Sequence, residues 1–488
     1  MMPHSFLFGH LHIIYRLIKE LPRDLHGNYV PYILMQNWRT LYPEEKTCPG
    51  LFYVDLWPIG PPTIFTIDPA FPTQSLFDLK QLKHHGSILS YLKPLTQNLD
   101  IVSATGKQWR TWRTWLSYGF APKNINSLVP IMLDEVVIFR DKLISLAGKD
   151  NNNHSWGKVF QLEHVTTNLS FDIIARASLD LRLNEQLEKP SLLRRAMADQ
   201  LDQMLLEYNI FSLPQILSPM RQWRIFRNTR NMRKALLPAV TAIINRPFSP
   251  ENRTILDLTV QAMRRDGKLA APDPKSESRK EEVEVDPFLI DTILAQLKAF
   301  IFAGHDTTAV TICWLLHSLT HFPDAAAKVR AELDDVLGTE RGTASLQKLR
   351  ETPHLVNSLV YLNAFMKETL RMYPSAAAFR VSSGDFVFHH PRDNRVYPTK
   401  GFMIADAVIA GMKYEGAWVR PDEFLPERWL AQEGEELHVK KNAWRPFGLG
   451  PRQCIGQELA MMQMKLVLAA VAREVDVDCA WDEWDALR

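Results

Sequence analysis

The chain has 488 residues, of which 46% are hydrophobic and 23% charged, an ordinary globular composition with enough apolar material for a large core. Its formal net charge of +2, with both signs mixed along the sequence, argues against a nucleic-acid partner. The four cysteines (Cys48, Cys313, Cys454 and Cys479) lie far apart and show neither metal-finger nor disulfide spacing, which fits a compartment facing the cytosol. No Gly/Ser-rich or Pro-rich linker divides the sequence, so we predict a single domain over residues 1–488.

The first 20 residues are apolar in part but are interrupted by histidines and by Arg16 and Lys19. This segment is too short and too polar to span a bilayer or to act as a secretory signal. Further on, residues 51–67 contain β-branched and aromatic residues around Pro58 and Gly60, which predicts two short strands joined by a turn. Asp68-Pro69 has the cap-then-proline order of a helix start.

Helical periodicity dominates the next part of the chain. Residues 84–103 are mixed and predict a loop with a short helix, after which five helices are expected, at 106–118, 127–147, 160–180, 191–209 and 219–245. Within 211–226, exposed-looking apolar residues are mixed with arginines. This pattern is typical either of a helix–loop–helix corner or of a surface that rests on a membrane.

Residues 270–286 are charged and predict a solvated connection, and the longest apolar helix follows at about 288–322. Lys298, His305 and Asp306 interrupt its apolar run, which favours a buried central helix over a membrane span. The sequence Ala303-Gly304-His305-Asp306-Thr307-Thr308 lies in its middle. Glycine and threonine are poor helix formers, so we expect either a simple polar patch or a local distortion.

Glu368 and Arg371 are three residues apart within a helical run over 359–372, so they share one helix face and can pair. Such pairs usually lie on solvated surfaces, where they contribute little to stability. The segment Pro426-Glu427-Arg428-Trp429 offers a second arginine further along.

One cysteine, Cys454, lies in the glycine-rich stretch Phe447-Gly448-Leu449-Gly450-Pro451-Arg452-Gln453-Cys454-Ile455-Gly456, just before a helical run to about Ala472. A helix N-terminus favours thiolate over thiol, and glycines allow close approach of a flat ligand. A thiolate presented in this way is a good axial ligand for haem iron. A lone cysteine is more often a buried small hydrophobe, but five fixed residues at fixed spacing favour the specific interpretation.

This stretch resembles the haem-binding loop of the cytochrome P-450 family of haem-thiolate monooxygenases. The resemblance extends from Phe6 to about Trp484, with five motifs in the family's order. It implies a mainly α fold with a minor β region at about 45–70 and 375–410, and a haem between the long central helix and the cysteine loop. The cofactor implied is haem b, with its axial thiolate from Cys454.

The resemblance also implies residue roles. Asp306 and Thr307 match the acid–alcohol pair that relays protons to dioxygen, with Thr308 beside them as a further catalytic residue. Glu368, Arg371 and Arg428 match a structural charge network, which is strongly destabilising to break once it is buried. The haem contacts implied are Trp109, Arg113, Ala303, Gly304, Arg380, Phe447, Arg452, Cys454 and Gly456. Substrate contacts are expected from 84–103, 205–225, Phe300, Ala303 and 376–379.

The reaction implied is insertion of one oxygen atom from O2 into an apolar organic substrate of secondary metabolism. Since the sequence has no nucleotide-binding motif, electrons would come from NADPH through a separate reductase. We expect it to dock near Arg110, Lys440, Lys441 and Arg445. The family's microsomal members lie on the cytosolic face of the endoplasmic reticulum membrane; this chain is expected to start after their N-terminal anchor and to lack their C-terminal hairpin.

Two alternatives stay open at this point. One is a haem-thiolate enzyme that couples or rearranges its substrate without inserting oxygen. The other is a truncated, non-catalytic protein that binds haem or lipid.

Overall fold

The computed structural model describes residues 2–22, 25–77, 83–147, 156–205, 216–247, 249–270, 285–375, 378–382, 385–390 and 395–486. The chain divides into two compact units. Unit 1 comprises Met1–Ile88 and Ala364–Cys454, and unit 2 comprises Leu89–Asn363 and Ile455–Arg488. Both segments predicted to be β-rich, around 45–70 and 375–410, contribute to unit 1.

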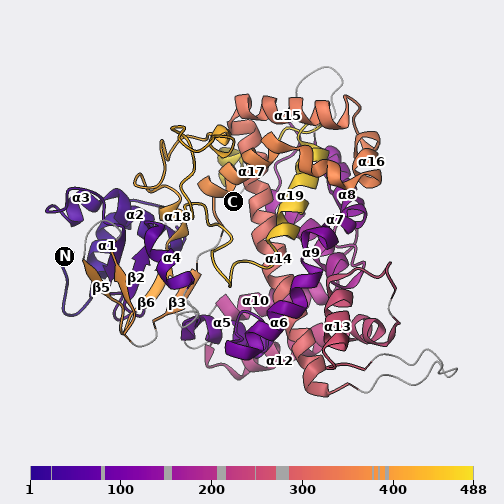
Figure 1. Cartoon of the computed structure of the whole chain (residues 1–488), viewed down its shortest axis with the longest axis horizontal. Coiled ribbons are helices and arrows are strands. Elements are labelled where there is room, and N and C mark those ends of the chain that lie inside the picture. Colours follow the sequence, from indigo (N-terminus) through magenta and orange to yellow (C-terminus); the bar gives the residue numbers. More distant parts are fainter. Residues whose placement is uncertain are drawn as a thin grey trace. The chain divides into compact units, whose positions relative to one another are not determined.

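Unit 1 is built on a four-stranded mixed sheet with the strand order β1-β2-β6-β3 (Figure 1). The strands are β1 (Leu51–Val54), β2 (Thr63–Thr66), β6 (Met403–Asp406) and β3 (Ala378–Val381). β2 pairs antiparallel with β1 and parallel with β6, and β3 pairs antiparallel with β6. A separate antiparallel pair is formed by β4 (Val387–His389) and β5 (Val396–Pro398). The strand pair predicted between residues 51 and 67 is confirmed as β1 and β2.

Alternation along β1 gives the sheet two apolar faces, because successive side chains of a strand point to opposite sides. Leu51 packs in one cluster with Ile64 and Phe71, whereas Phe52 and Val54 belong to another. The second cluster includes residues of three short helices, α1 (Leu11–Ile18), α2 (Val30–Gln36) and α18 (Val408–Gly411). The predicted helix start at Asp68-Pro69 is also present: Asp68 Oδ1 accepts a hydrogen bond from Ala70 N at 2.9 Å, at the start of α4 (Ala70–Leu76).

Helices form most of the rest of the described chain (Figure 1). They are α3 (Trp38–Leu41), α5 (Gly86–Thr96), α6 (Gly106–Gly119), α7 (Pro122–Ser127), α8 (Val129–Leu146), α9 (Leu162–Leu179), α10 (Leu192–Leu205), α12 (Pro219–Asn245), α13 (Ile255–Arg265), α14 (Pro287–His321), α15 (Pro323–Leu337), α16 (Thr343–Glu351), α17 (Val360–Met372), α19 (Gln457–Val471) and α20 (Trp481–Ala486), with 3-10 turns at Gly27–Tyr29, Pro353–Ser358 and Pro426–Trp429. The five predicted helices correspond to α6, α8, α9, α10 and α12, although 206–209 lie outside the described residues.

The central helix of unit 2 is α14. Its contact with α9 is the most extensive between any two of the described elements. Asp286 Oδ1 accepts a hydrogen bond from Phe288 N, and Pro287 occupies the first turn, so the helix start is capped. By length and composition α14 could cross a membrane, but 56% of its most apolar window is buried inside the structure. That burial fits the predicted central core helix.

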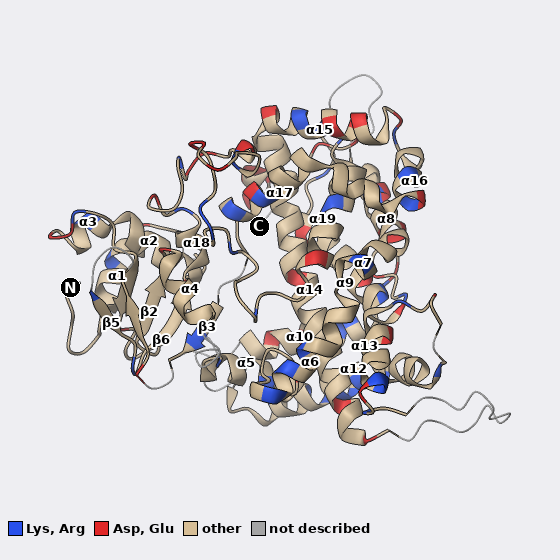
Figure 2. Cartoon of the chain, viewed as in Figure 1, with Lys and Arg blue, Asp and Glu red and all other residues tan. Residues whose placement is uncertain are grey.

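Basic and acidic residues are interspersed over the described parts of both units (Figure 2). The totals are also nearly equal, with 57 Lys and Arg against 55 Asp and Glu in the sequence.

Candidate functional site

The cysteine loop in unit 1 is a series of tight turns fixed by its own backbone. Gly448 N donates to Arg445 O at 2.9 Å, and Gln453 N donates to Gly450 O at 3.0 Å. Cys454 N then donates to Phe447 O at 2.8 Å, so the cysteine lies across the loop from the aromatic residue. Gly450 has φ +72°, and a Cβ there would lie 2.6 Å from Leu76 O. Only glycine fits this position, which explains one of the fixed residues of the motif.

Helix α19 begins directly after this loop, with Gly456 as its N-cap residue. The predicted helical run from Ile455 to about Ala472 therefore agrees with α19 to within two residues. Cys454 precedes the N-cap by two residues, where the unpaired N–H groups and the dipole of the helix favour negative charge. The sequence position of Cys454 therefore suits a thiolate.

The other three cysteines are in surroundings that favour the neutral thiol. Burial raises the pKa of Cys48 to about 12 and that of Cys313 to about 11. The pKa of Cys479 is also raised, by burial and by Asp478. A raised thiol pKa disfavours the thiolate that a metal needs. Of the four cysteines, Cys454 is the one placed at a glycine loop and a helix start.

Unit 1 also contains a cluster formed by buried Arg380 and by half-buried Arg452 and His84. Arg380 Nη1 donates to His84 Nδ1 at 3.1 Å and to Phe379 O at 2.8 Å. Burial, and to a smaller extent the positive charges of Arg380 and Arg452, lower the pKa of His84 to about 3. The imidazole is therefore neutral and accepts from the guanidinium.

Burial also lowers the pKa of Arg380, to about 10, despite an opposing effect of Asp406. Its Nε is buried and has no hydrogen-bond partner among the described residues. A carboxylate is the group that such a guanidinium accommodates best. The cluster thus fits the propionates of a haem, and the glycine loop fits the flat approach of its ring.

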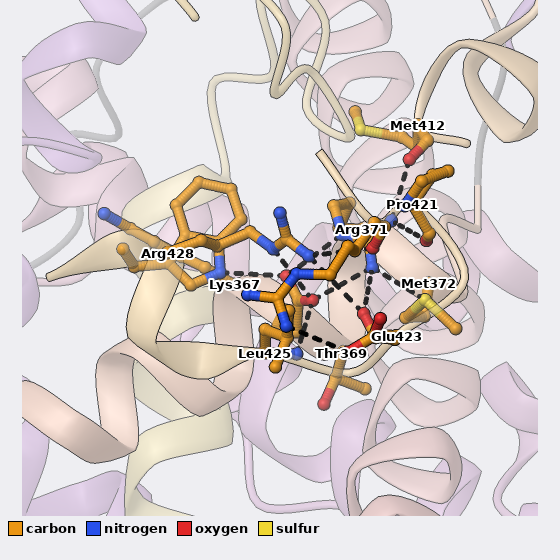
Figure 3. A network of polar contacts seen from close by, with 12 residues as sticks. Lys367, Thr369, Arg371, Met372, Met412, Pro421, Glu423, Leu425 and Arg428 are labelled. Atoms are coloured by element: carbon orange, nitrogen blue, oxygen red, sulfur yellow. Dashed lines mark hydrogen bonds and ion pairs between the residues drawn. The ribbon is translucent and has the colours of Figure 1, made fainter. Parts of the chain in front are cut away.

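Glu368, Arg371 and Arg428 come together in a fully buried network. Figure 3 labels its two arginines. Glu368 Oε1 accepts from Arg371 Nη2 at 2.9 Å and from Arg428 Nε at 3.0 Å, and Glu368 Oε2 accepts from Arg371 Nε at 3.0 Å. The backbone N–H of Leu425 donates to the same carboxylate at 2.9 Å. Because two cations share one anion, the remaining guanidinium N–H groups need other acceptors.

Backbone carbonyl groups supply those acceptors. Arg371 donates to Met412 O at 2.9 Å, to Pro421 O at 2.7 Å and to Glu423 O at 2.9 Å (Figure 3). Arg428 Nη1 donates to Val419 O at 3.0 Å. The network therefore joins α17 to the irregular segment 412–428, and its role is to fix that segment.

In unit 2, the Ala303–Thr308 segment lies within α14, which continues through it without a break. Thr307 Oγ1 donates to Ala303 O at 2.7 Å, so the threonine engages a backbone carbonyl group, and α14 is not interrupted there. Asp306 and Thr307 are exposed, as is Ala303, whereas Thr308 is buried.

Gly304 faces α9. A Cβ at this position would lie 3.3 Å from the side chain of Ile174, so the absence of a side chain is explained by close packing of α9 on α14. On α6, Trp109 is buried and Arg113 is half-buried, one helical turn apart. They share a helix face, as their spacing predicts.

Comparison with known proteins decides the family. The family model described as "Cytochrome P450" matches residues 54–483. The chain belongs to the cytochrome P450 family. A cytochrome P450 monooxygenase, polC, from Polytolypa hystricis is 33% identical over 99% of this chain and 82% of its own length. The Aspergillus aculeatus monooxygenase acrF is 28% identical over 95% of this chain and 90% of its own.

The fold agrees with that assignment. A crystal structure of the cytochrome P450 CYP102L1 matches with a TM-score of 0.70 at 21% identity, covering 91% of this chain and 92% of the other. Together these results confirm the predicted family, its mainly α fold with a small sheet, and its class as a P450 monooxygenase. Enzymes of this family hold haem through a cysteine thiolate and use O2, an organic substrate and a redox partner.

One residue predicted to contribute to reductase docking on this P450 was wrongly placed. Arg445 is fully buried, with its Nε 3.0 Å from both carboxylate oxygens of Asp406 and its Nη2 donating to Ile67 O at 3.0 Å. It therefore offers no surface charge. The sequence did not reveal this burial, because Arg445 closely follows Lys440 and Lys441 and was therefore assigned to the same basic surface.

Several residues beside the P450 motifs were missed by sequence reasoning. Trp429 donates from Nε1 to Glu368 Oε2 at 3.1 Å, and the ring of Trp418 lies against both arginines of the network, 5.3 Å from Arg371 and 5.7 Å from Arg428. His84 joins the cluster of Arg380 and Arg452. Trp429 could have been found, since it directly follows Arg428 in the motif; Trp418 and His84 carry no local signal.

His305 of the Ala303–Thr308 segment is also better defined by the structure. It is buried, its Nδ1 lies 2.7 Å from Ile301 O, and its ring packs edge-on against Phe171 at 5.5 Å. The guanidinium of Arg194, on α10, lies 5.3 Å from the centre of the same Phe171 ring and interacts electrostatically with Asp306. Of the predicted substrate regions, 206–215 and 376–377 lie outside the described residues.

Proposed function

We propose that the chain inserts one oxygen atom from O2 into an apolar organic substrate of secondary metabolism, with Cys454 as the thiolate ligand of a haem b. The observation that carries the proposal is the cysteine loop, in which glycine turns fix Cys454 opposite Phe447 immediately before α19. Membership of a family of monooxygenases, with fungal relatives across nearly the whole chain, supports the reaction class.

The haem, when bound, supplies oxygen activation and electron transfer; the protein's residues hold it and manage protons. Arg380 and Arg452 bind its propionates, with His84 as a neutral acceptor that orients Arg380. Trp109 and Arg113 of α6 provide further donors. With haem bound, Phe447, whose carbonyl group accepts from Cys454 N, would pack near the thiolate and exclude water from it.

Protons are delivered by Asp306 and Thr307, with Thr308 beside them. Both delivery residues are exposed on α14, where Ala303 leaves room for substrate. The hydroxyl group of Thr307 is oriented by its hydrogen bond to Ala303 O, which leaves its oxygen lone pairs free to accept a hydrogen bond from a proton-carrying group.

The electrons are supplied by NADPH through a separate reductase that docks on basic residues including Arg110, Lys440 and Lys441. The enzyme works at the cytosolic face of the endoplasmic reticulum. Membrane contact by the 211–226 segment is supported by exposed Leu217, Trp223 and Phe226 in its described part; residues 211–215 lie outside the described residues.

Replacing Thr307 tests the proton-delivery part of the proposal. With an apolar compound that the parent oxidises, Thr307→Ala should retain haem but divert most NADPH electrons to hydrogen peroxide, because proton relay is impaired. The measurement is the ratio of peroxide released to NADPH consumed. Thr311→Ala, one turn further along α14, is the matched control, since Thr311 likewise bonds a carbonyl group one turn back.

If Thr307→Ala releases no more peroxide per NADPH consumed than the parent does, Thr307 takes no part in the relay. Product formed under isotopically labelled O2 gives the second readout. The proposal predicts a product that contains one labelled oxygen atom. An unlabelled product, formed by coupling or rearrangement of the substrate, would show that the enzyme does not insert oxygen.

A further inference from the structure

Unit 2 contains a large cavity whose described lining residues all belong to that unit, with a volume of about 1050 Å³. Three parts of the chain line it: the end of α8 with residues 156–163, the part of α14 between Val310 and His317, and residues within 474–484, which follow α19. The volume lies at the upper end of the range for small-molecule sites. None of the lining residues is among those assigned above to haem, proton delivery or reductase docking.

The wall formed by residues 474–484 is fixed to the helices beside it. Thr320 Oγ1, on α14, donates to Val477 O at 2.5 Å, and Arg330 Nη2, on α15, donates to Asp476 Oδ1 at 2.6 Å. This wall is therefore held by contacts of the protein itself, as expected of a preformed binding site.

The wall formed by residues 156–163 is placed by a close crossing of two backbone segments. A Cβ at Gly157 would lie 2.0 Å from the carbonyl oxygen of Leu146, the last residue of α8, so only glycine permits this approach. The crossing brings Trp156, directly before the glycine, to the lining of the cavity.

Four tryptophans line the cavity, which we therefore call the tryptophan cavity: Trp156, Trp314, Trp481 and Trp484. Trp156 and Trp481 are 65% and 69% exposed, whereas Trp314 and Trp484 are half-buried. An indole ring offers a large apolar area and a face of negative potential, so it binds apolar groups and cations alike. The aromatic lining thus suits a ligand that combines the two.

The charged residues around the tryptophan cavity are mostly acidic. Its acidic lining residues are Glu163, Glu474, Asp476, Asp478 and Glu483, whereas Lys158 is the single lysine or arginine in the described lining. The imidazole of His317 adds no positive charge at neutral pH, because burial and the neighbouring His321 lower its pKa. The cavity therefore favours a cation and disfavours an anion.

Protein cations compensate two of these carboxylates only. Asp476 pairs with Arg330, and Glu474 lies 3.9 Å from Arg140 Nε. The other three, Glu163, Asp478 and Glu483, have no ion pair with a lysine or arginine in the described part of the chain.

An organic cation fits this combination better than a metal ion does. The described residues contain no group of three or more His, Cys, Asp or Glu side chains that could hold a metal ion. Spread-out carboxylates beside indole rings instead suit an ammonium group whose charge is shielded by alkyl groups.

We propose that the tryptophan cavity binds an organic cation, namely a quaternary ammonium or a protonated tertiary amine with an apolar body. The indole rings contact the apolar body and the alkyl groups on nitrogen, and the uncompensated carboxylates supply the negative potential. The site goes beyond the proposed oxygenation, because it uses none of the residues assigned to that reaction.

Isothermal titration calorimetry of the haem-loaded full chain tests the proposal. The parent should bind benzyltriethylammonium at least about tenfold more tightly than the neutral N,N-diethylbenzamide, and should not bind the anion 4-tert-butylbenzoate. The double variant Trp156→Ala and Trp481→Ala should bind the cation at least about tenfold more weakly. Trp57→Ala, which removes a similarly exposed tryptophan of unit 1, is the matched control and should bind like the parent. Circular dichroism checks that each variant is folded.

A second pair of variants tests the role of charge separately from that of the rings. Glu163→Gln combined with Glu483→Gln should weaken binding of the cation about fivefold and leave binding of N,N-diethylbenzamide unchanged. Glu251→Gln, an exposed carboxylate of unit 2 outside the cavity, should bind the cation like the parent.

Alkylation of Cys479 reports where the cation binds. This exposed cysteine lines the cavity, with its Sγ 3.3 Å from His317 Nδ1. Benzyltriethylammonium should slow its alkylation by N-ethylmaleimide in proportion to occupancy, as measured by peptide mass spectrometry.

Three results would overturn the proposal: equal affinity of the parent for the cation and for N,N-diethylbenzamide, a double tryptophan variant that binds the cation like the parent, or an unchanged rate of Cys479 alkylation at saturating cation. The first would show that the cavity selects apolar shape alone, and the third that the cation binds elsewhere. None of these measurements uses turnover, so their failure is separate from failure of the proposed reaction.

Discussion

Burial governs the ionisable side chains of both units at the scale of single residues. In unit 2, Asp172 on α9 accepts from Glu185 N at 3.0 Å and from Gln186 N at 3.1 Å, yet burial raises its pKa to about 7. In unit 1, burial next to two arginines keeps His84 neutral, with a lowered pKa. In each case loss of hydration by the charged form has the largest effect on the pKa. The two N–H donors oppose it at Asp172, whereas the two arginines add to it at His84.

Asp172 should make the stability of unit 2 depend on pH. Its folded pKa of about 7 lies above the ordinary value of 3.8, so the folded state binds the proton more tightly. The free energy of unfolding contributed by this group is therefore fully present below about pH 4 and decreases as pH rises toward about 7. Asp172→Asn should flatten this part of the curve, measured as the thermal midpoint from about pH 5 to about pH 8.

The control for this prediction is Asp335→Asn on α15, which alters a carboxylate outside the core and should keep the parent's slope. Loss of a hydrogen bond alone would lower the midpoint of Asp172→Asn equally at every pH. Such a constant offset would show that Asp172 does not titrate as described.

At the scale of elements, the Glu368 network connects three parts of unit 1: α17, the irregular segment after Met412, and the 3-10 turn Pro426–Trp429. Irregular backbone cannot satisfy its carbonyl groups by periodic hydrogen bonds, so the guanidinium groups of Arg371 and Arg428 do so instead. This explains why two arginines are buried around one glutamate.

Glu368→Gln should destabilise the protein by about 3–5 kcal/mol, because both guanidinium groups would stay buried without their counter-charge. Trp429→Phe removes one hydrogen bond and should cost only about 1 kcal/mol. Glu433→Gln, an exposed change nearby in sequence, is the control. Denaturant unfolding and soluble yield measure the order, and a Glu368→Gln variant as stable as the parent would contradict it.

Elements with strong periodicity could be predicted from the sequence, and their contacts could not. The β1–β2 pair, α14 and the five helices α6, α8, α9, α10 and α12 follow from the spacing of apolar residues. The 84–103 region was predicted to be a loop with a short helix, and α5 at Gly86–Thr96 is such a helix, although its bounds and the Pro94 inside it could not be predicted. A helix that contains proline and mixed polarity is held by its packing, which local sequence does not report.

The same limit applies to the candidate site. Glu368, Arg371 and Arg428 could be grouped from motif order, because the family resemblance supplied the long-range pairing. The burial of Arg445 against Asp406 and the approach of His84 to Arg380 join residues far apart in sequence. No periodic pattern marks such contacts, since they depend on how the chain folds back within unit 1.

At the scale of the whole molecule, the motifs that carry the proposed chemistry are distributed over both units. Cys454, Arg380 and the Glu368 network belong to unit 1, and the Ala303–Thr308 segment belongs to α14 of unit 2. Membership of the P450 family joins them in one function, since the family model extends over residues 54–483 and thus includes all of them. The thiolate role of Cys454 is the central claim on which the others depend.

The most direct test of that claim is the absorption spectrum of the reduced protein under carbon monoxide. The parent should show the red-shifted Soret band of a thiolate-ligated haem, and Cys454→Ala should lose it. Cys479→Ala, which removes another exposed cysteine, should keep the band. An unshifted band in the parent, or a red-shifted band that survives in Cys454→Ala, would contradict the assignment of Cys454 as the haem ligand.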